Sequence, residues 1–336
     1  MAFALENAPF DDLRALIMKS PDADEEARVR ARLRQEQIAL PAGELGRLAD
    51  LAIWMAGWQE GDAPHIDRPM VAVFASSHQI AAQGVSRYDA ARAREMADAV
   101  LQGTGAVNQI AKAAGAGLKV FELALEEATP DITQNAALTE RDCAAVMAYA
   151  MQVLEDKPDV LSIGVVGAGA TTAAGAMALA LYGGTPAFWA VAGSAVDDED
   201  MLAAKAKIIG AAVDYHSGNL DDPLEVLRRV GGRDMAGAAG AILAARHQGV
   251  PVVLDGFATC AAAAVLHRIN PAAVDHCVAG SVTPRDSHRA ILDRLGKQPI
   301  LDLGLGLGDG SGAALAINVL RAAIACHNDL GQAQPL

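Results

Sequence analysis

Stretches with the apolar, β-branched composition of buried strands alternate with stretches of helical periodicity over residues 70–325. Parallel strands need long crossover connections, usually helices, whereas antiparallel strands can be joined by tight hairpins. The alternation therefore predicts an α/β fold built on a doubly wound, mostly parallel sheet. Strands are expected at residues 70–75, 118–123, 160–166, 251–257, 277–282 and 299–307.

The first 60 residues differ from the rest of the chain, because they contain helical stretches and no strand. These stretches lie at residues 11–19, 25–37 and 46–54. Three short helices cannot readily form a large core alone. We therefore expect them to pack against another part of the chain.

A glycine cluster follows the last expected strand, with the sequence Leu307-Gly308-Asp309-Gly310-Ser311-Gly312, and leads into a helical stretch at 313–325. A helix N-terminus presents N–H groups without intrahelical partners, and glycine lets the backbone approach a ligand closely. Asp309 stands in the middle of this turn, where its carboxylate could take a proton or face a developing positive charge. The alternative is a tight capping turn with Asp309 as the N-cap. These residues alone leave both interpretations open.

Polar or glycine-rich segments follow two other expected strands, at the strand ends where open α/β sheets bind ligands. Gly167-Ala168-Gly169-Ala170-Thr171-Thr172 precedes a helix expected at 173–181 and is typical of a phosphate-cradling loop. A dinucleotide-binding fingerprint is not met, since the third glycine is missing. Ser77 and His78 follow the strand at 70–75. His78 is a candidate site residue, with a hydrogen-bonded loop residue as the alternative.

Composition excludes several classes of protein. The 336 residues suit one large α/β domain with an appendage, and the formal net charge of −14 argues against a nucleic-acid surface. We see neither a signal peptide nor an uninterrupted apolar stretch of membrane-spanning length, so a cytoplasmic protein without membrane contact is expected. The acidic run at 197–200 is a candidate metal site, but a solvated helix start explains it better.

Four cysteines, at positions 143, 260, 277 and 326, show neither close pairs nor metal-ligand spacing. This pattern predicts reduced, buried thiols in a cytosolic protein.

Sequence blocks along nearly the whole chain resemble one family, in the family's order. The blocks are Leu45-Gly46-Arg47-Leu48, Gly84-Val85-Ser86, Asp222-Pro223-Leu224-Glu225-Val226-Leu227, Val230-Gly231-Gly232, Leu254-Asp255-Gly256-Phe257 and the glycine cluster with Ala313-Ala314. The family is that of the nicotinate-nucleotide–dimethylbenzimidazole phosphoribosyltransferases, of cobalamin lower-ligand assembly. By these blocks the chain is identified as a divergent member.

The resemblance implies a Rossmann-like domain at residues 66–312. It also implies a small helical domain formed by residues 1–65 with part of the C-terminal helix, 313–336, and a homodimer with active sites near the subunit interface. In the family, a nitrogen of the base attacks the anomeric carbon of nicotinate mononucleotide. Nicotinate then leaves, and an α-ribazole phosphate forms with inversion. No metal or other cofactor is implied, because the pyridinium leaving group carries its own activation.

The resemblance also implies the site residues. Asp309 takes the place of the catalytic glutamate in the family's Leu-Gly-Glu-Gly motif. Substrate contacts are implied for Ser77, His78, Gly167, Gly169, Thr171, Thr172, Gly193, Ser194, Lys205, Ser281, Gly308 and Gly310.

Several pocket positions depart from the family. The carboxylate of Asp309 sits on a stem one CH₂ shorter, and a displacement of about 1 Å can cost about a hundredfold in rate. A glutamate of the first glycine loop is Val165 here, and the arginine before the catalytic motif is Gly306. These changes predict a less charged cleft, with weak affinity for the nicotinate carboxylate and retained or broadened affinity for apolar aromatic bases.

Three functions are consistent with this pattern. The first is the family's phosphoribosyl transfer to a benzimidazole-type base. The second is a related transferase that uses another base or another nucleotide donor. The third is a catalytically weak binding or regulatory protein on the same scaffold.

Overall fold

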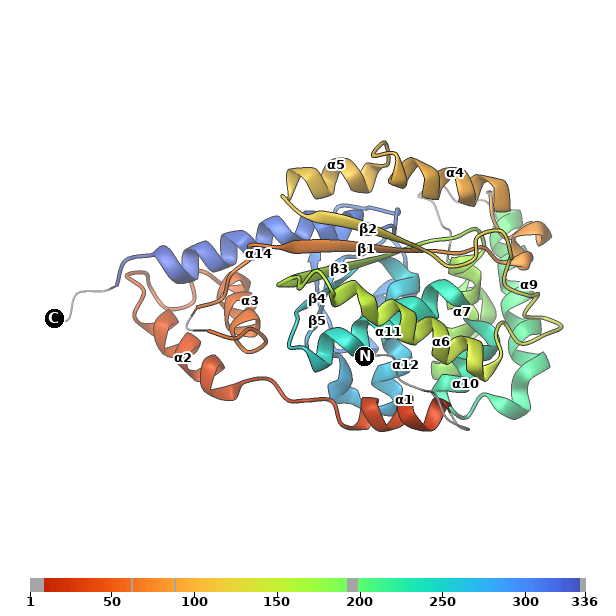
Figure 1. The fold of residues 1–336 in the computed structure, drawn as a ribbon, viewed down its shortest axis with the longest axis horizontal. Helices are drawn as coiled ribbons and strands as arrows, with labels where there is room; N and C mark the ends of the chain where they lie inside the picture. Colours follow the sequence, from red (N-terminus) through yellow and green to blue (C-terminus); the bar gives the residue numbers. More distant parts are fainter. Residues whose placement is uncertain (1–8, 62, 88, 192–198, 333–336) are drawn as a thin grey trace.

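The computed structural model describes residues 9–61, 63–87, 89–191 and 199–332. Its centre is a six-stranded sheet in the order β2-β1-β3-β4-β5-β6, with every neighbouring pair parallel (Figure 1). The strands are β1 (Pro69–Ala75), β2 (Gly117–Glu122), β3 (Val160–Val166), β4 (Val252–Leu254), β5 (Cys277–Ser281) and β6 (Pro299–Leu301). This arrangement confirms the predicted α/β fold with a parallel, doubly wound sheet.

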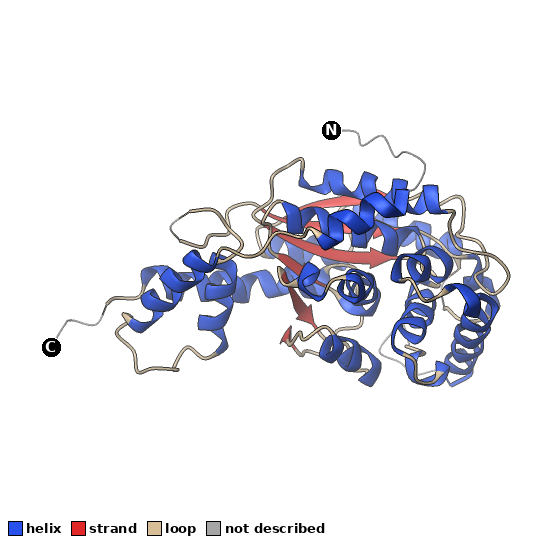
Figure 2. Cartoon of the chain, turned by 90° about the horizontal axis from the view of Figure 1, so that it is seen from below, coloured by secondary structure: helices blue, strands red, loops and turns tan. Residues whose placement is uncertain are grey.

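Helices cover both faces of the sheet (Figure 2). One face packs against α11 (Arg233–His247) and α12 (Gly256–Ile269), with α6 (Glu140–Ala150) behind them. The other face packs against α14 (Ser311–Asp329), α5 (Ala106–Ala113) and α4 (Ala90–Leu101). Strands covered on both sides are mostly apolar, as the fully buried β3 is, with Ser162 as its one polar residue.

Small residues allow the helices to pack closely. Gly240 of α11 lies against the backbone of Met147 in α6, and Gly237 lies against the ring of Phe74 in β1. A side chain at either position would overlap its neighbour. The many alanines and glycines of this chain therefore bring helix and sheet close together, which compensates for the scarcity of aromatic residues.

A further group of helices surrounds the carboxyl end of the sheet. It comprises α7 (Ala170–Tyr182), α8 (Pro186–Trp189), α9 (Glu199–His216) and α10 (Pro223–Val230). α13 (Asp286–Arg294) packs on α12, and 3-10 turns lie at Gln79–Gln83, Met151–Leu154, Ser217–Asn219 and Pro271–Val274. Glu199 and Asp200 form the first turn of α9, which agrees with the predicted helix start; Asp197 and Asp198 lie outside the described residues.

The three N-terminal helices do not form a core of their own, as expected. α1 (Pro9–Met18) packs on α6 and α12, whereas α3 (Arg47–Ala56) packs on α14 and on α2 (Glu25–Glu36). α2, α3 and the far half of α14 project from one end of the molecule (Figure 1). The division into a domain at 66–312 and a small domain from the two chain ends remains a proposal.

Two strand predictions are wrong at their ends. The strand expected at 299–307 stops at Leu301, since Gly304 and Gly308 both have φ of +68°, which a strand cannot contain. The strand expected at 251–257 stops at Leu254, because α12 begins at Gly256, which has φ of +77°.

Within the helical connection between β2 and β3, α6 ends at Ala150 and continues as the 3-10 turn Met151–Leu154.

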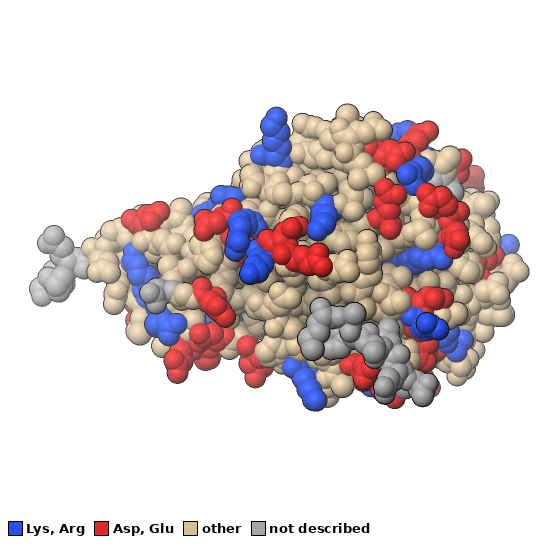
Figure 3. Space-filling view, in the orientation of Figure 1, with Lys and Arg blue, Asp and Glu red and all other residues tan. Residues whose placement is uncertain are grey.

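Two features expected from composition can be compared with the structure. The four cysteines are free thiols; the prediction of burial is confirmed for Cys143, Cys260 and Cys277 and is wrong for Cys326, which is partly exposed. Acidic and basic side chains are interspersed on the face drawn in Figure 3, and no basic patch gathers there. Within the described ranges, no helix combines the length and the apolar character needed to cross a bilayer.

Candidate functional site

A cleft opens at the carboxyl ends of β1, β3, β4 and β5. β2 lies on one side of β1, whereas β3 and the later strands lie on the other. The topological switch point of the sheet is therefore between β1 and β3, at this end of the strands. The walls come from the ends of these strands, from α4, α7, α9 and α12, and from the irregular segment before α14. The lining residues are Val85, Ser86, Arg87, Met96, Val165, Val166, Gly167, Ala168, Gly169, Ala170, Thr171, Val191, Met201, Lys205, Gly256, Phe257, Ala258, Thr283, Gly306, Leu307 and Gly308.

One wall of the cleft is the glycine turn between β3 and α7. Gly169 caps α7 with φ of +89°, a conformation that favours glycine. The N–H groups of Ala168, Gly169 and Thr171 have no hydrogen-bond partner in the described part of the chain. Thr172 is fully buried behind the turn. Free N–H groups at the N-terminus of a 13-residue helix form an anion-accepting surface.

Lys205 of α9 reaches this wall, and its Nζ donates a hydrogen bond of 2.7 Å to Thr171 Oγ1. The side chain is only 2% exposed, and this burial lowers the pKa of Lys205 to about 7. A bound phosphate would favour the charged form of Lys205, because an opposite charge nearby raises the pKa of an amine. The Lys205 side chain and the free N–H groups beside it therefore suit a phosphate.

The glycine cluster before α14 lies against three neighbouring strand ends that also carry glycine. A Cβ at Gly164 of β3 would overlap the peptide between Asp309 and Gly310, and Val165 N–H donates to Gly308 O at 2.9 Å. A Cβ at Gly256 would lie 2.8 Å from Gly308 Cα, and one at Gly280 would lie 2.6 Å from Ala313 Cα. The strands therefore admit this turn only because they lack side chains there.

Asp309 lies in this turn, next to the lining residue Gly308. It is 8% exposed, and its Oδ1 accepts a hydrogen bond of 3.0 Å from Ser311 N–H. The N-cap of α14 is Gly310, with φ of +101°, so Asp309 precedes the cap position that the alternative interpretation gave it.

A second buried carboxylate, that of Asp255, holds the same turn. Its Oδ2 accepts from Gly310 N–H at 2.9 Å and from Gly312 N–H at 3.2 Å, and its Oδ1 accepts from Ser281 Oγ at 2.9 Å. Burial, with the nearby charge of Asp309, raises the pKa of Asp255 to about 6. Ser281 therefore supports the turn from behind and does not line the cleft.

Ser77 and His78 lie behind the lining of the cleft. His78 Nε2 is 3.0 Å from Asp234 Oδ2, and both side chains are buried. Ser77 Oγ donates to Leu125 O at 3.0 Å. These contacts agree with the alternative of a hydrogen-bonded loop residue for His78.

The structure thus brings most of the predicted site residues to one place. Gly167, Gly169, Thr171, Lys205 and Gly308 line the cleft. Ser77, His78, Thr172, Ser281, Asp309 and Gly310 are buried behind that lining. Gly193 and Ser194 lie outside the described residues. Val165 and Gly306, the two positions at which the resemblance implies a departure from the family, both line the cleft.

Sequence reasoning missed Arg87, Phe257 and Thr283, which also line the cleft. Arg87 is exposed, and Arg87 and Lys205 are the charged residues among the described lining. The signal for Arg87 was its place directly after Gly84-Val85-Ser86.

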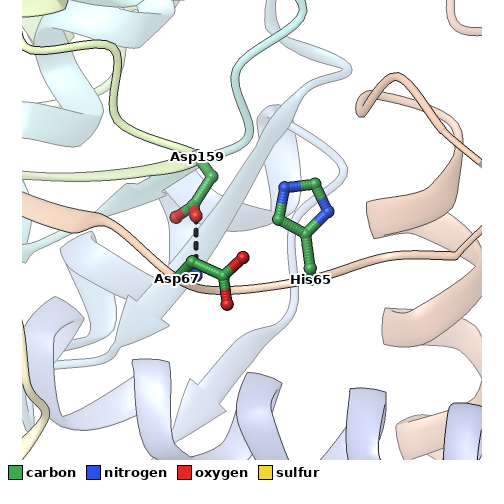
Figure 4. A group of neighbouring side chains, drawn as sticks. All are labelled: His65, Asp67 and Asp159. Atoms are coloured by element: carbon green, nitrogen blue, oxygen red, sulfur yellow. Dashed lines mark hydrogen bonds between the residues drawn. The ribbon is translucent and has the colours of Figure 1, made fainter.

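His65, Asp67 and Asp159 gather at the opposite edge of the sheet, before β1 and β3 (Figure 4). One potential ligand atom from each lies within 4.8 Å of the others. Asp159 Oδ2 already accepts hydrogen bonds from Asp67 N–H at 2.6 Å and Arg68 N–H at 2.7 Å. Asp159 thereby fixes the entry to β1, which is a structural role away from the cleft.

The fold and the cleft together define a class: a doubly wound α/β protein with an anion-accepting glycine turn at its switch point. A family model described as a phosphoribosyltransferase matches residues 20–334. The chain is 48% identical over 323 residues to the nicotinate-nucleotide–dimethylbenzimidazole phosphoribosyltransferase of Methylocella silvestris, covering 96% of this chain and 94% of that protein. It is 46% identical over 327 residues to the enzyme of the same name from Agrobacterium fabrum, covering 97% and 94%.

A solved structure of the Thermus thermophilus enzyme of that name superposes with a TM-score of 0.83 at 33% identity, over 92% of this chain and 97% of that one. The chain therefore belongs to this phosphoribosyltransferase family.

Proposed function

We propose that this protein transfers the phosphoribosyl group of nicotinate mononucleotide to a benzimidazole-type base, giving an α-ribazole phosphate for the lower ligand of cobalamin. The observation that carries the proposal is the match with relatives of that name over nearly the whole chain, together with a carboxylate beside an anion-accepting cleft. Incubation of the purified protein with nicotinate mononucleotide and 5,6-dimethylbenzimidazole tests it directly. Release of nicotinate with formation of the riboside phosphate is the expected result.

The reaction asks little of the protein beyond positioning and one proton transfer. A ring nitrogen of the base attacks the anomeric carbon from the face opposite the pyridinium. The bond to nicotinate breaks, and nicotinate leaves with the electron pair. The proton on the other ring nitrogen passes to the Asp309 carboxylate, because the product base would otherwise carry a positive charge. Phe257, Val165 and Leu307 supply apolar surface in the cleft for the two aromatic rings.

The 5′-phosphate is assigned to the turn of Gly167, Gly169 and Thr171 with Lys205, and we expect Lys205→Met to abolish stabilisation by inorganic phosphate. The pKa of about 7 lies below the value near 10.4 of an unfolded chain, so the unfolded state binds more protons between these values. Burial of the charged lysine therefore costs on the order of 4 kcal/mol below pH 7, and this cost falls as the pH rises from 7 to 10. Urea unfolding from pH 6 to 9, with and without phosphate, measures both effects.

Lys207→Met is the matched control, because Lys207 is exposed on the same helix. The variant should keep the phosphate effect. Equal stabilisation of both variants by phosphate would move the phosphate away from Lys205.

The nicotinate carboxylate is assigned to Arg87, because Gly306 removes the arginine that the family carries there. We expect Arg87→Gln to lower kcat/KM for nicotinate mononucleotide by about 10–100-fold, the value of a charge-assisted hydrogen bond. Nicotinamide mononucleotide lacks the carboxylate, so its own low rate should not change. On this assignment, Arg87 offsets the weak nicotinate affinity that Gly306 alone would cause.

Steady-state kinetics with both nucleotides measures this difference, and Arg141→Gln on the exposed face of α6 serves as the control. Equal losses with both nucleotides would contradict the assignment and place Arg87 at the phosphate instead.

We further propose a cytoplasmic homodimer, as the family resemblance implies. The acidic composition and the free thiols support the compartment. Sedimentation of the purified protein tests the dimer.

A further inference from the structure

Asp255 occupies the N-cap position of α12 without capping that helix. An N-cap aspartate ordinarily accepts a hydrogen bond from an N–H group of its own first turn. Here the side chain makes no such bond. Its carboxylate instead turns to a segment 55 residues further along the chain, where it accepts from Gly310 N–H and Gly312 N–H. Asp255 therefore leaves the first turn of α12 uncapped and contacts the glycine turn.

The two carboxylates share three successive N–H groups at the start of α14. Asp255 accepts from Gly310 and Gly312, while Asp309 accepts from Ser311 between them. Ser281 Oγ donates to the remaining oxygen of Asp255 and fixes the rotation of that carboxylate. The backbone that follows Asp309, on both sides of Ser311, is therefore held by one buried carboxylate.

We propose that Asp255 is a positioning residue of the transfer reaction, which sets the place of the Asp309 carboxylate by holding the N–H groups on either side of Ser311, the residue whose N–H donates to Asp309. This inference rests on the proposed function of the cleft. Asp255 is 2% exposed and both of its oxygens accept hydrogen bonds, whereas Asp309 is 8% exposed and accepts through Oδ1 alone in the described structure, so Asp255 acts through Asp309. The need for such an anchor is plain in this chain, because Asp309 has a short stem and cannot correct an error of position by changing rotamer.

The charge of Asp255 gives the proposal a second readout. Its pKa of about 6 is raised by burial and by Asp309, and it is lowered by the bonds from Ser281, Gly310 and Gly312. Cys260 of α12 is the other titratable group that interacts with it in the described structure. Protonation of Asp255 below pH 6 places a hydrogen on one carboxyl oxygen, which is then a weaker hydrogen-bond acceptor. We therefore expect kcat to fall below pH 6 as the turn loosens.

The experiment compares wild type with Asp255→Asn. The amide is nearly isosteric and keeps one accepting oxygen, but it neither carries the charge nor titrates. We expect kcat at pH 7.5 to fall by about 10–100-fold, KM for nicotinate mononucleotide to change less than about threefold, and the acid limb near pH 6 to disappear. Hydrogen exchange of the peptide containing residues 308–312 should become faster.

Asp159→Asn is the matched control, because Asp159 also accepts two backbone N–H bonds with a largely buried carboxylate at the opposite edge of the sheet. It should lose stability, yet keep kcat per folded molecule, the acid limb and the exchange of residues 308–312.

The following outcomes would contradict the positioning role of Asp255 or the proposed function. An Asp255→Asn variant with wild-type kcat, or with the acid limb retained, would overturn the proposal. Unchanged exchange at residues 308–312 would overturn it whatever the activity. Absence of nicotinate release by the wild type contradicts the proposed function alone, since faster exchange in Asp255→Asn would still show the anchor.

Discussion

Asp309→Asn is expected to lower kcat by about 10²–10⁴-fold, the usual contribution of a positioned general base. An amide cannot take the proton from the attacking base. Its oxygen can still accept from Ser311 N–H, so the glycine turn and the phosphate contact should persist. Nicotinate release under saturating substrates measures kcat, and phosphate-dependent stabilisation reports on the intact site.

Asp309→Glu provides the control for reach. It restores the CH₂ by which this chain falls short of the family's glutamate, so turnover should be retained or raised. Wild-type turnover in Asp309→Asn would remove this residue from the mechanism.

The sequence predicted the architecture because the relevant signals are local. Most strands of the sheet are apolar stretches bounded by glycine, proline or polar residues, and helical segments connect them. The phosphate turn was likewise visible, since Gly167, Gly169 and Thr171 follow a strand and open a helix. Lys205 was found through the family motif alone, because nothing in its own segment distinguishes it from an exposed helical lysine such as Lys207.

What could not be predicted depends on contacts between distant segments. From its neighbours in the sequence, Asp255 is an ordinary N-cap residue. Its contact with the glycine turn exists only because the fold places the end of β4 beside Gly310 and Gly312. His78 lies in a polar cluster after a strand end, where a ligand contact is expected. Its hydrogen-bond partner, Asp234, lies 156 residues away in the sequence and holds the His78 side chain behind the cleft. The length of β6 was misjudged, since alternating leucines suggested a strand while Gly304 and Gly308 adopt left-handed conformations.

The resemblance implies a loss of charge at Val165 and Gly306, and both positions line the cleft. The conclusion of a weakly charged cleft nevertheless overlooked Arg87, which enters from the segment after β1. A binding surface is assembled from several strand ends, and a residue lost from one can be replaced from another.

Among substitutions that add one methyl group to the sheet near the site, Gly164→Ala is expected to be the most damaging. The added Cβ would overlap the peptide of Asp309 and Gly310, and backbone atoms cannot move aside as a flexible side chain can. Overpacking a dense core costs about 1–3 kcal/mol and occasionally more, and we expect the upper end here. Displacing the turn by about 1 Å should also cost about a hundredfold in kcat for the molecules that remain folded. Urea unfolding and nicotinate release measure the two effects separately.

Gly218→Ala is the matched control, because no atom lies within 4 Å of a Cβ built at that exposed position. It should leave both the free energy of unfolding and kcat unchanged. Two relaxations would reduce the effect of Gly164→Ala: a shift of β3 away from α14, or an outward movement of the glycine turn. The first opens the core beneath α14 and lowers stability, while the second moves Asp309 and lowers kcat. A Gly164→Ala protein with wild-type stability and wild-type kcat would therefore show that the turn does not rest on β3 as described.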